Sequence, residues 1–208
     1  VTDAVKSREY YEKAAELGSC FALVELSFLY ENGDGVEESY EKAFELCSKA
    51  AGEGYPYAMF RVGLYLEKGV LGEARPEEAF GWYIKAAEAG DTDAIFALGR
   101  CYKHGLGTEE DFDKALEWFS KGVEKNEARC LTELGLAYEN GNGVEENPQK
   151  AVEYMTQAAE QNYGYAQFKM GDYNFFGYGS CLEDNKKAVE WYEKAVANQV
   201  PMAMIRMG

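Results

Sequence analysis

Apolar residues recur at helical spacing along the chain. Between residues 75 and 90, apolar side chains occupy positions i, i+3, i+4, i+7 and i+8, namely Ala79, Trp82, Tyr83, Ala86 and Ala87. This spacing places them on one face of a helix with 3.6 residues per turn. The pattern predicts an amphipathic helix over 75–90, and it returns around Ala115 and Ala188.

Small residues between and within the helices keep a period of 36. A loop glycine recurs at Gly33, Gly69, Gly105, Gly141 and Gly177. A mid-helix position holds Ser27, Gly63, Gly99, Gly135 and Gly171. Several positions that share one period indicate a helical solenoid, in which each unit packs on its neighbours.

We therefore predict an all-α solenoid of helix-turn-helix repeats that occupies residues 1–208 as a single domain. Five full units are expected, at 20–55, 56–91, 92–127, 128–163 and 164–200. Partial units are expected at 1–19 and 201–208, as in a fragment of a longer chain.

The sequence also predicts how the helices begin and end. Each predicted unit consists of a first helix, a loop and a second helix. The position before the second helix of each unit holds Ser39, Arg75, Asp111, Asn147 and Asp184, of which four are good N-caps. The turn between repeats holds Gly18, Gly54, Gly90, Asn126, Asn162 and Asn198. Glycine and asparagine favour the left-handed backbone that often ends a helix.

The recurring residues resemble the Sel1-like repeat family, relatives of tetratricopeptide repeats with a longer inner loop. In the third unit the matching residues are Ala94, Leu98, Gly99, Tyr102, Gly105, Gly107, Lys114, Ala115, Trp118, Phe119 and Lys121. The resemblance covers nearly the whole chain and implies a right-handed α-α superhelix. In departures from the family pattern, Ser27 replaces a glycine, Gly122 an alanine and Asn174 a tyrosine.

Composition narrows the class of partner. The formal net charge of −16 argues against nucleic acid and against anionic membrane surfaces. The five cysteines are irregularly spaced and form no CxxC pair. Cys130 stands where other repeats carry alanine and is expected to be a small buried residue. One branch of the resembled family has paired cysteines in each repeat. Because they are absent here, we expect a cytoplasmic, reduced protein.

No catalytic constellation is visible, so we expect a non-enzymatic protein with no cofactor and no metal. The chain lacks H-E-x-x-H, G-x-S-x-G and Cys–His signatures. The only histidine, His104, is expected at a helix end, where a cation is favoured. The acidic residues 109–113 lack the ligand spacing of an EF-hand and are expected to be a solvated helix start. The Gly-x-Gly loops recur at every repeat, so backbone geometry explains them better than phosphate binding.

By resemblance to tetratricopeptide repeats, the first helices should line a concave groove. The predicted partner-binding residues there are Tyr57, Phe60, Arg61, Lys68, Phe96, Arg100, Lys103, His104, Arg129, Phe168 and Lys169. Aromatic anchors combined with arginine are typical of interface hot spots. We expect a protein or extended peptide that bears carboxylates or a free C-terminus, which basic clusters bind. Alternatively, these cations pair with the groove acids Glu67, Asp93, Glu133 and Asp172 and have no binding role.

The main functional hypothesis is therefore a protein–protein interaction scaffold or adaptor. A second is the interaction region of a larger enzyme or signalling protein. A third is a capture module for a small molecule or a cell-wall fragment, in a pocket formed by Tyr165, Phe168, Phe175 and Phe176. Open repeats at both ends also predict end-to-end self-association, because solenoids normally cover their terminal apolar faces with capping repeats.

Overall fold

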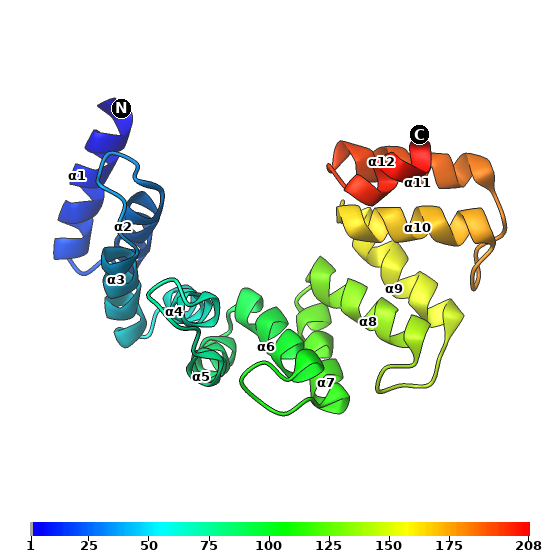
Figure 1. Cartoon of the computed structure of the whole chain (residues 1–208), viewed down its shortest axis with the longest axis horizontal. Helices are drawn as coiled ribbons and strands as arrows, with labels where there is room; N and C mark the ends of the chain where they lie inside the picture. Colours follow the sequence, from blue (N-terminus) through cyan, green and yellow to red (C-terminus); the bar gives the residue numbers. More distant parts are fainter. Residues whose placement is uncertain (1) are drawn as a thin grey trace. The chain divides into compact units, whose positions relative to one another are not determined.

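The computed structural model describes residues 2–208, with side chains from Val5 onward, and every regular element in this part of the chain is an α-helix (Figure 1). The predicted all-α class is therefore confirmed. The twelve helices are α1 (Thr2–Glu16), α2 (Cys20–Asn32), α3 (Tyr40–Gly52), α4 (Pro56–Lys68), α5 (Pro76–Glu88), α6 (Thr92–His104), α7 (Phe112–Glu124), α8 (Ala128–Asn140), α9 (Pro148–Glu160), α10 (Gly164–Phe176), α11 (Asn185–Ala197) and α12 (Pro201–Met207).

The chain divides into two compact units, residues 1–111 and 112–208. In the first unit, each of the helices α1 to α6 packs on the next helix in sequence. The helices α7 to α12 of the second unit follow the same rule. This nearest-neighbour packing within each unit is the pattern of a repeat array. The single 1–208 solenoid remains a prediction.

The helix ends follow from the residues at the caps. The side chains of Ser39, Asn147 and Asp184 accept hydrogen bonds from backbone nitrogens at the start of α3, α9 and α11. Each such bond satisfies an otherwise unpaired N–H of the first helical turn. Arg75 makes no side-chain cap; there Pro76 occupies the first helical turn, where it has no N–H to satisfy.

The turn prediction is correct except in the last repeat. Gly18, Gly54, Gly90, Asn126 and Asn162 all have positive φ, but Asn198 has φ of −86° and Gln199 has φ of 58°. The loop before α11 is one residue longer than a period of 36 allows, so α11 and the turn after it are displaced by one position. The side chain of Asn198 instead bonds to Asn162 and Gln167.

Small residues allow the paired helices to approach closely. The alanines that recur in the second helices are almost completely buried, and Cys130 is fully buried, as predicted. At Gly63 in α4, an added Cβ would lie 2.6 Å from the ring of Tyr83 in α5. Gly171 and Tyr192 repeat this arrangement at 2.3 Å. The mid-helix glycine therefore makes room for a large side chain of the second helix.

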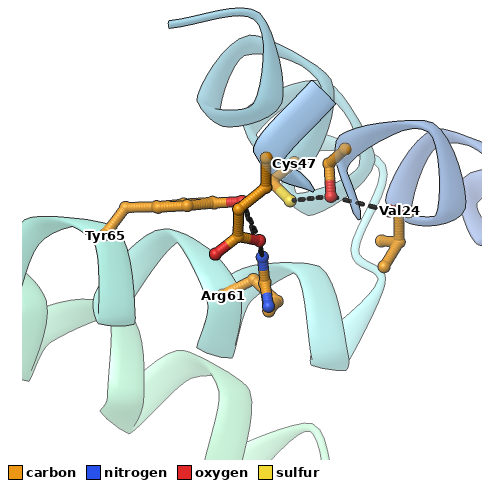
Figure 2. Close-up of polar contacts among 6 residues, drawn as sticks. Val24, Cys47, Arg61 and Tyr65 are labelled. Carbon is orange, nitrogen blue, oxygen red and sulfur yellow. Dashed lines mark hydrogen bonds and ion pairs between the residues drawn. The ribbon is translucent and has the colours of Figure 1, made fainter. Parts of the chain in front are cut away.

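The first repeat solves the same packing problem with different residues. Ser27 replaces the glycine, and Cys47 stands where the second repeat has Tyr83. The Ser27 hydroxyl donates to the Val24 carbonyl at 2.6 Å, and the Cys47 thiol donates to Ser27 Oγ at 3.1 Å (Figure 2). A larger residue on the first helix is thus matched by a smaller one on the second.

We expect Gly63→Ser to destabilise the protein by about 1–3 kcal/mol, because its Cβ overlaps the Tyr83 ring. Tyr83→Cys alone should also destabilise, because it leaves a cavity. The double variant recreates the pair found in the first repeat and should lose less than the sum of the two single losses. Urea unfolding of the four proteins in a double-mutant cycle measures this coupling. Strictly additive losses would show that the two positions are independent.

Candidate functional site

The predicted groove residue Arg61 lies in a buried polar cluster between α2, α3 and α4. Arg61 is 7% exposed, and its guanidinium donates hydrogen bonds to the Glu31 carboxylate and, at 2.6 Å, to the Tyr65 hydroxyl (Figure 2). The Tyr65 hydroxyl donates to Glu31 at 3.2 Å. The guanidinium carbon also lies 4.2 Å from the centre of the Phe28 ring, a cation–π distance. A partner could reach Arg61 only by displacing these neighbours.

Electrostatics keep this cluster charged. Burial alone lowers the pKa of Arg61, but hydrogen bonds and charge interactions with Tyr65 and Glu31 hold it above its usual value. Burial raises the pKa of the Tyr65 hydroxyl. The cluster at neutral pH is therefore a guanidinium and a carboxylate bridged by a neutral phenol, with no spare charge for a ligand.

An equivalent cluster lies in the second unit. The Lys169 ammonium is 2.7 Å from a Glu139 oxygen, and the Tyr173 hydroxyl donates to the same carboxylate at 2.9 Å. Its three residues stand 108 positions, or three periods of 36, after Glu31, Arg61 and Tyr65. In both clusters the acid comes from one repeat and the cation and tyrosine from the next. The clusters therefore join neighbouring first helices.

Aromatic rows accompany both clusters. Phe60 packs between Tyr57 and Tyr83, with ring centres 6.0 and 5.8 Å away. In the second unit, Phe168 lies between Tyr165 and Tyr192 at 6.3 and 6.1 Å. Tyr57 and Phe60 remain partly exposed, whereas Phe168 is buried. In the α4 row both Tyr57 and Phe60 offer ring surface to a partner, whereas in the α10 row only Tyr165 is partly exposed.

The remaining predicted cations differ in environment. Arg100 in α6 lies 3.4 Å from Glu67, one of the acids named by the pairing alternative, and its side chain is 39% exposed. Arg129 pairs with Glu127 at 2.7 Å. Burial raises the pKa of the Glu127 carboxyl, but its hydrogen bonds and attraction to Arg129 outweigh this and lower it overall. Lys68 and His104 are exposed, while Phe96 and Lys103 are partly buried.

The four aromatic residues of the third functional hypothesis form two pairs. Tyr165 packs on Phe168, while Phe175 and Phe176 meet edge to face at 4.8 Å and are largely exposed. Phe176 lines a cavity of about 220 Å³ together with Lys169. Among the side chains that the structure describes, from Val5 onward, no three His, Cys, Asp or Glu are grouped so as to hold a metal ion.

Sequence reasoning missed the two tyrosines that complete the polar clusters. Tyr65 and Tyr173 both stand two residues after the mid-helix glycine, where the other repeats have Leu29, Cys101 and Ala137. A tyrosine there, combined with a cation two residues before the glycine, is the signal that would have identified both clusters.

Among the described residues, no helix is long and apolar enough to cross a membrane.

Comparison with known proteins identifies the repeat. The profile of the Sel1 repeat matches residues 2–19, 21–55, 56–91, 92–127, 128–163 and 164–199. No curated protein sequence matches the chain significantly.

Solved structures of similar fold also include Sel1 repeat proteins. A Sel1 repeat protein from Oxalobacter formigenes is 30% identical with a TM-score of 0.85, covering 98% of this chain and 86% of its own. The protective antigen c5321 of uropathogenic Escherichia coli is 27% identical with a TM-score of 0.83, covering 95% of this chain and 42% of its own. The immunity protein Pa5087 of Pseudomonas aeruginosa is 25% identical with a TM-score of 0.65, covering 91% and 72%. With six repeats matched along nearly its whole length, the chain belongs to the Sel1 repeat family, whose members are generally protein-interaction scaffolds.

Proposed function

We propose that this chain is a scaffold that binds an extended, carboxylate-bearing peptide on the first helices of its first unit. The proposed contact residues are Tyr57, Phe60, Lys68, Arg100 and His104. All five lie on α4 and α6, which contact one another. The partly exposed rings of Tyr57 and Phe60 would anchor an apolar side chain, as aromatic residues commonly do at interfaces.

The exposure of Arg100 is the observation that carries this proposal. Arg61 and Lys169 are enclosed by their acid partners, with side chains only 8% and 15% exposed. Arg100 is 39% exposed and reaches Glu67 at the outer limit of a hydrogen bond, 3.4 Å. A partly exposed guanidinium with a long contact can turn to a new carboxylate at little energetic cost, because exposed ion pairs are weak. Lys68 adds a positive charge in the last turn of α4, and His104 lies in the last turn of α6.

A peptide selected from a random display library against the whole chain is expected to combine an aromatic residue with acidic groups. Arg100→Glu should weaken the affinity of the selected peptide at least about tenfold, equivalent to about 1.4 kcal/mol. The loss arises because the new carboxylate repels the peptide. Fluorescence anisotropy with the labelled peptide measures the affinity.

Arg75→Glu is the matched control for charge. Arg75 is 49% exposed and pairs with Glu78 at 3.3 Å, but it precedes a second helix. This control should leave affinity for the peptide within about twofold, because exposed ion pairs of this kind contribute little. Equal binding by Arg100→Glu and by the unaltered chain would move the interface away from α4 and α6.

A further inference from the structure

A cavity in the second unit lies at the position where the repeat pattern is broken. Its volume is about 560 Å³, within the usual range for ligand pockets. It is lined by Val152 of α9, Asn174 of α10 and Lys187 and Trp191 of α11, and by Cys181 in the loop between α10 and α11. The second helices α9 and α11 form its sides, so it differs from the α4–α6 surface proposed above.

Asn174 occupies a position that holds an aromatic side chain elsewhere. The corresponding residues of the first, third and fourth repeats are Tyr30, Tyr102 and Tyr138. The backbone at this position does not change: the carbonyls of Tyr138 and Asn174 each accept from the backbone N–H of the N-cap residue of the next helix at 2.8 Å. The repeats therefore differ in the side chain, and asparagine leaves space where a tyrosine ring would lie.

The contacts of the Tyr138 ring show which residues would surround a ring placed in that space. The Tyr138 ring stacks on Tyr154 with centres 5.8 Å apart and planes 10° from parallel. The Lys150 ammonium is 4.8 Å from the centre of the ring and 3.4 Å from its hydroxyl. One repeat later, after the one-residue insertion, Tyr154 and Lys150 become Trp191 and Lys187. Both of these residues line the cavity.

A third contact follows the same correspondence. The Tyr102 ring packs edge to face on Phe80 of the preceding second helix, with centres 5.3 Å apart. Two repeats later, Phe80 corresponds to Val152, which also lines the cavity. The cavity is thus lined by an aromatic ring, Trp191, a cation, Lys187, and an apolar side chain, Val152. The tyrosine ring that contacts the equivalent residues in other repeats is absent, because Asn174, only 3% exposed, stands in its place.

We propose that this cavity binds a phenolic ring supplied in trans, stacked on Trp191 with its hydroxyl oxygen toward the Lys187 ammonium. The ring takes the place that a tyrosine of the chain itself takes in three other repeats. A tyrosine side chain of a partner polypeptide and a free phenol share this chemistry. The indole of Trp191 and the ammonium of Lys187 recognise both, because they contact only the ring and its hydroxyl.

Alkylation of Cys181 reports occupancy directly. Cys181 lines the cavity and is partly exposed, and Cys20, in the first unit, is partly exposed and serves as an internal control. The other three cysteines are buried. Iodoacetamide is applied to the whole chain with increasing p-cresol, and peptide mass spectrometry follows both sites. We expect p-cresol to slow alkylation of Cys181 by at least about fivefold without affecting Cys20, because only an occupied cavity shields its thiol. Equal rates with and without p-cresol, or equal slowing at both cysteines, would overturn the proposal.

Further arms separate the two sources and test the geometry. Protection by N-acetyltyrosinamide as well as by p-cresol would assign the site to a polypeptide tyrosine. Protection by p-cresol alone would assign it to a free phenol. Asn174→Tyr should fill the cavity from within, abolish protection by both probes and raise the thermal midpoint by about 2–4 °C, the shift expected for each kcal/mol gained. An Asn174→Tyr protein that still shows p-cresol protection of Cys181 would contradict the placement of the ring.

Discussion

Glu31→Ala is expected to lower the free energy of unfolding by about 3–5 kcal/mol, the usual loss when a buried ion pair is left with one partner. Arg61 is 7% exposed and its Nε already lacks a hydrogen-bond acceptor among the described residues. Without Glu31, its guanidinium would lose its carboxylate partner and keep the Tyr65 hydroxyl and the rings of Phe28 and Tyr65. Urea or thermal unfolding measures the loss, and a decrease below about 1 kcal/mol would show that the pair behaves as a surface ion pair.

Two further variants separate charge from packing. Glu45→Ala removes an exposed acid from α3, in the same repeat as Glu31, and should change stability by less than about 0.5 kcal/mol. Glu31→Leu combined with Arg61→Met replaces the pair with apolar residues of similar size. This double variant should regain most of the loss, because apolar replacements of buried ion pairs are often neutral or stabilising. A double variant as unstable as Glu31→Ala would locate the loss in packing rather than in the unpaired charge.

The sequence predicted the architecture because each repeat carries the same local signals. Caps such as Ser39 and Asn147, the left-handed glycines and the buried alanines act within one or two turns of helix, so periodicity is sufficient to locate them. The displacement from Asn198 to Gln199 was missed because the turn was placed by the 36-residue spacing from Asn162, although Asp184 already stands one residue beyond that spacing.

The candidate site was less predictable because its polar groups pair across repeats. Position within the helix placed Arg61, Arg100 and Lys169 on one predicted surface. Burial then separated them: Arg61 is enclosed by Glu31 and Tyr65, while Arg100 remains accessible. The acid partners lie 30 or more positions away, so within the helix that carries the cation only the tyrosine four residues later marks the enclosed position. The cavity beside Asn174 was signalled by a single departure from the repeat, but its size depends on three helices together.

Stability is expected to fall steeply above pH 10, by about 5–6 kcal/mol per pH unit for four buried tyrosines at about 1.4 kcal/mol each. The four are Tyr65, Tyr83, Tyr173 and Tyr192, and each donates a hydrogen bond to a carboxylate. Burial, with the nearby negative charge, raises the pKa of each hydroxyl in the folded state. The unfolded chain releases these protons near pH 10 while the folded chain retains them. The stabilisation is therefore complete below pH 10 and is lost as the pH rises toward the folded-state pKa values.

Two buried thiols also contribute to the loss of stability, and their contribution begins at a lower pH than that of the tyrosines. Burial raises the pKa of Cys101 and Cys130 to about 12, whereas the unfolded thiols ionise near pH 8.5, so their contribution begins to fall there. Tyrosinate absorbance should appear together with the loss of helical circular dichroism, because the buried hydroxyls ionise on unfolding.

Tyr83→Phe isolates one of these groups. At neutral pH it should lower stability by about 1–3 kcal/mol, because Glu67 loses the hydrogen bond donated at 2.5 Å. Above pH 10 the difference from the unaltered chain should shrink by about 1.4 kcal/mol per pH unit, since the variant has one fewer proton to lose on unfolding. Tyr10→Phe, which removes an exposed hydroxyl, should leave the slope unchanged. A difference between Tyr83→Phe and the unaltered chain that stays constant with pH would mean that Tyr83 ionises alike in both states. In that case the Tyr83–Glu67 hydrogen bond would not favour the protonated form of the Tyr83 hydroxyl in the folded state.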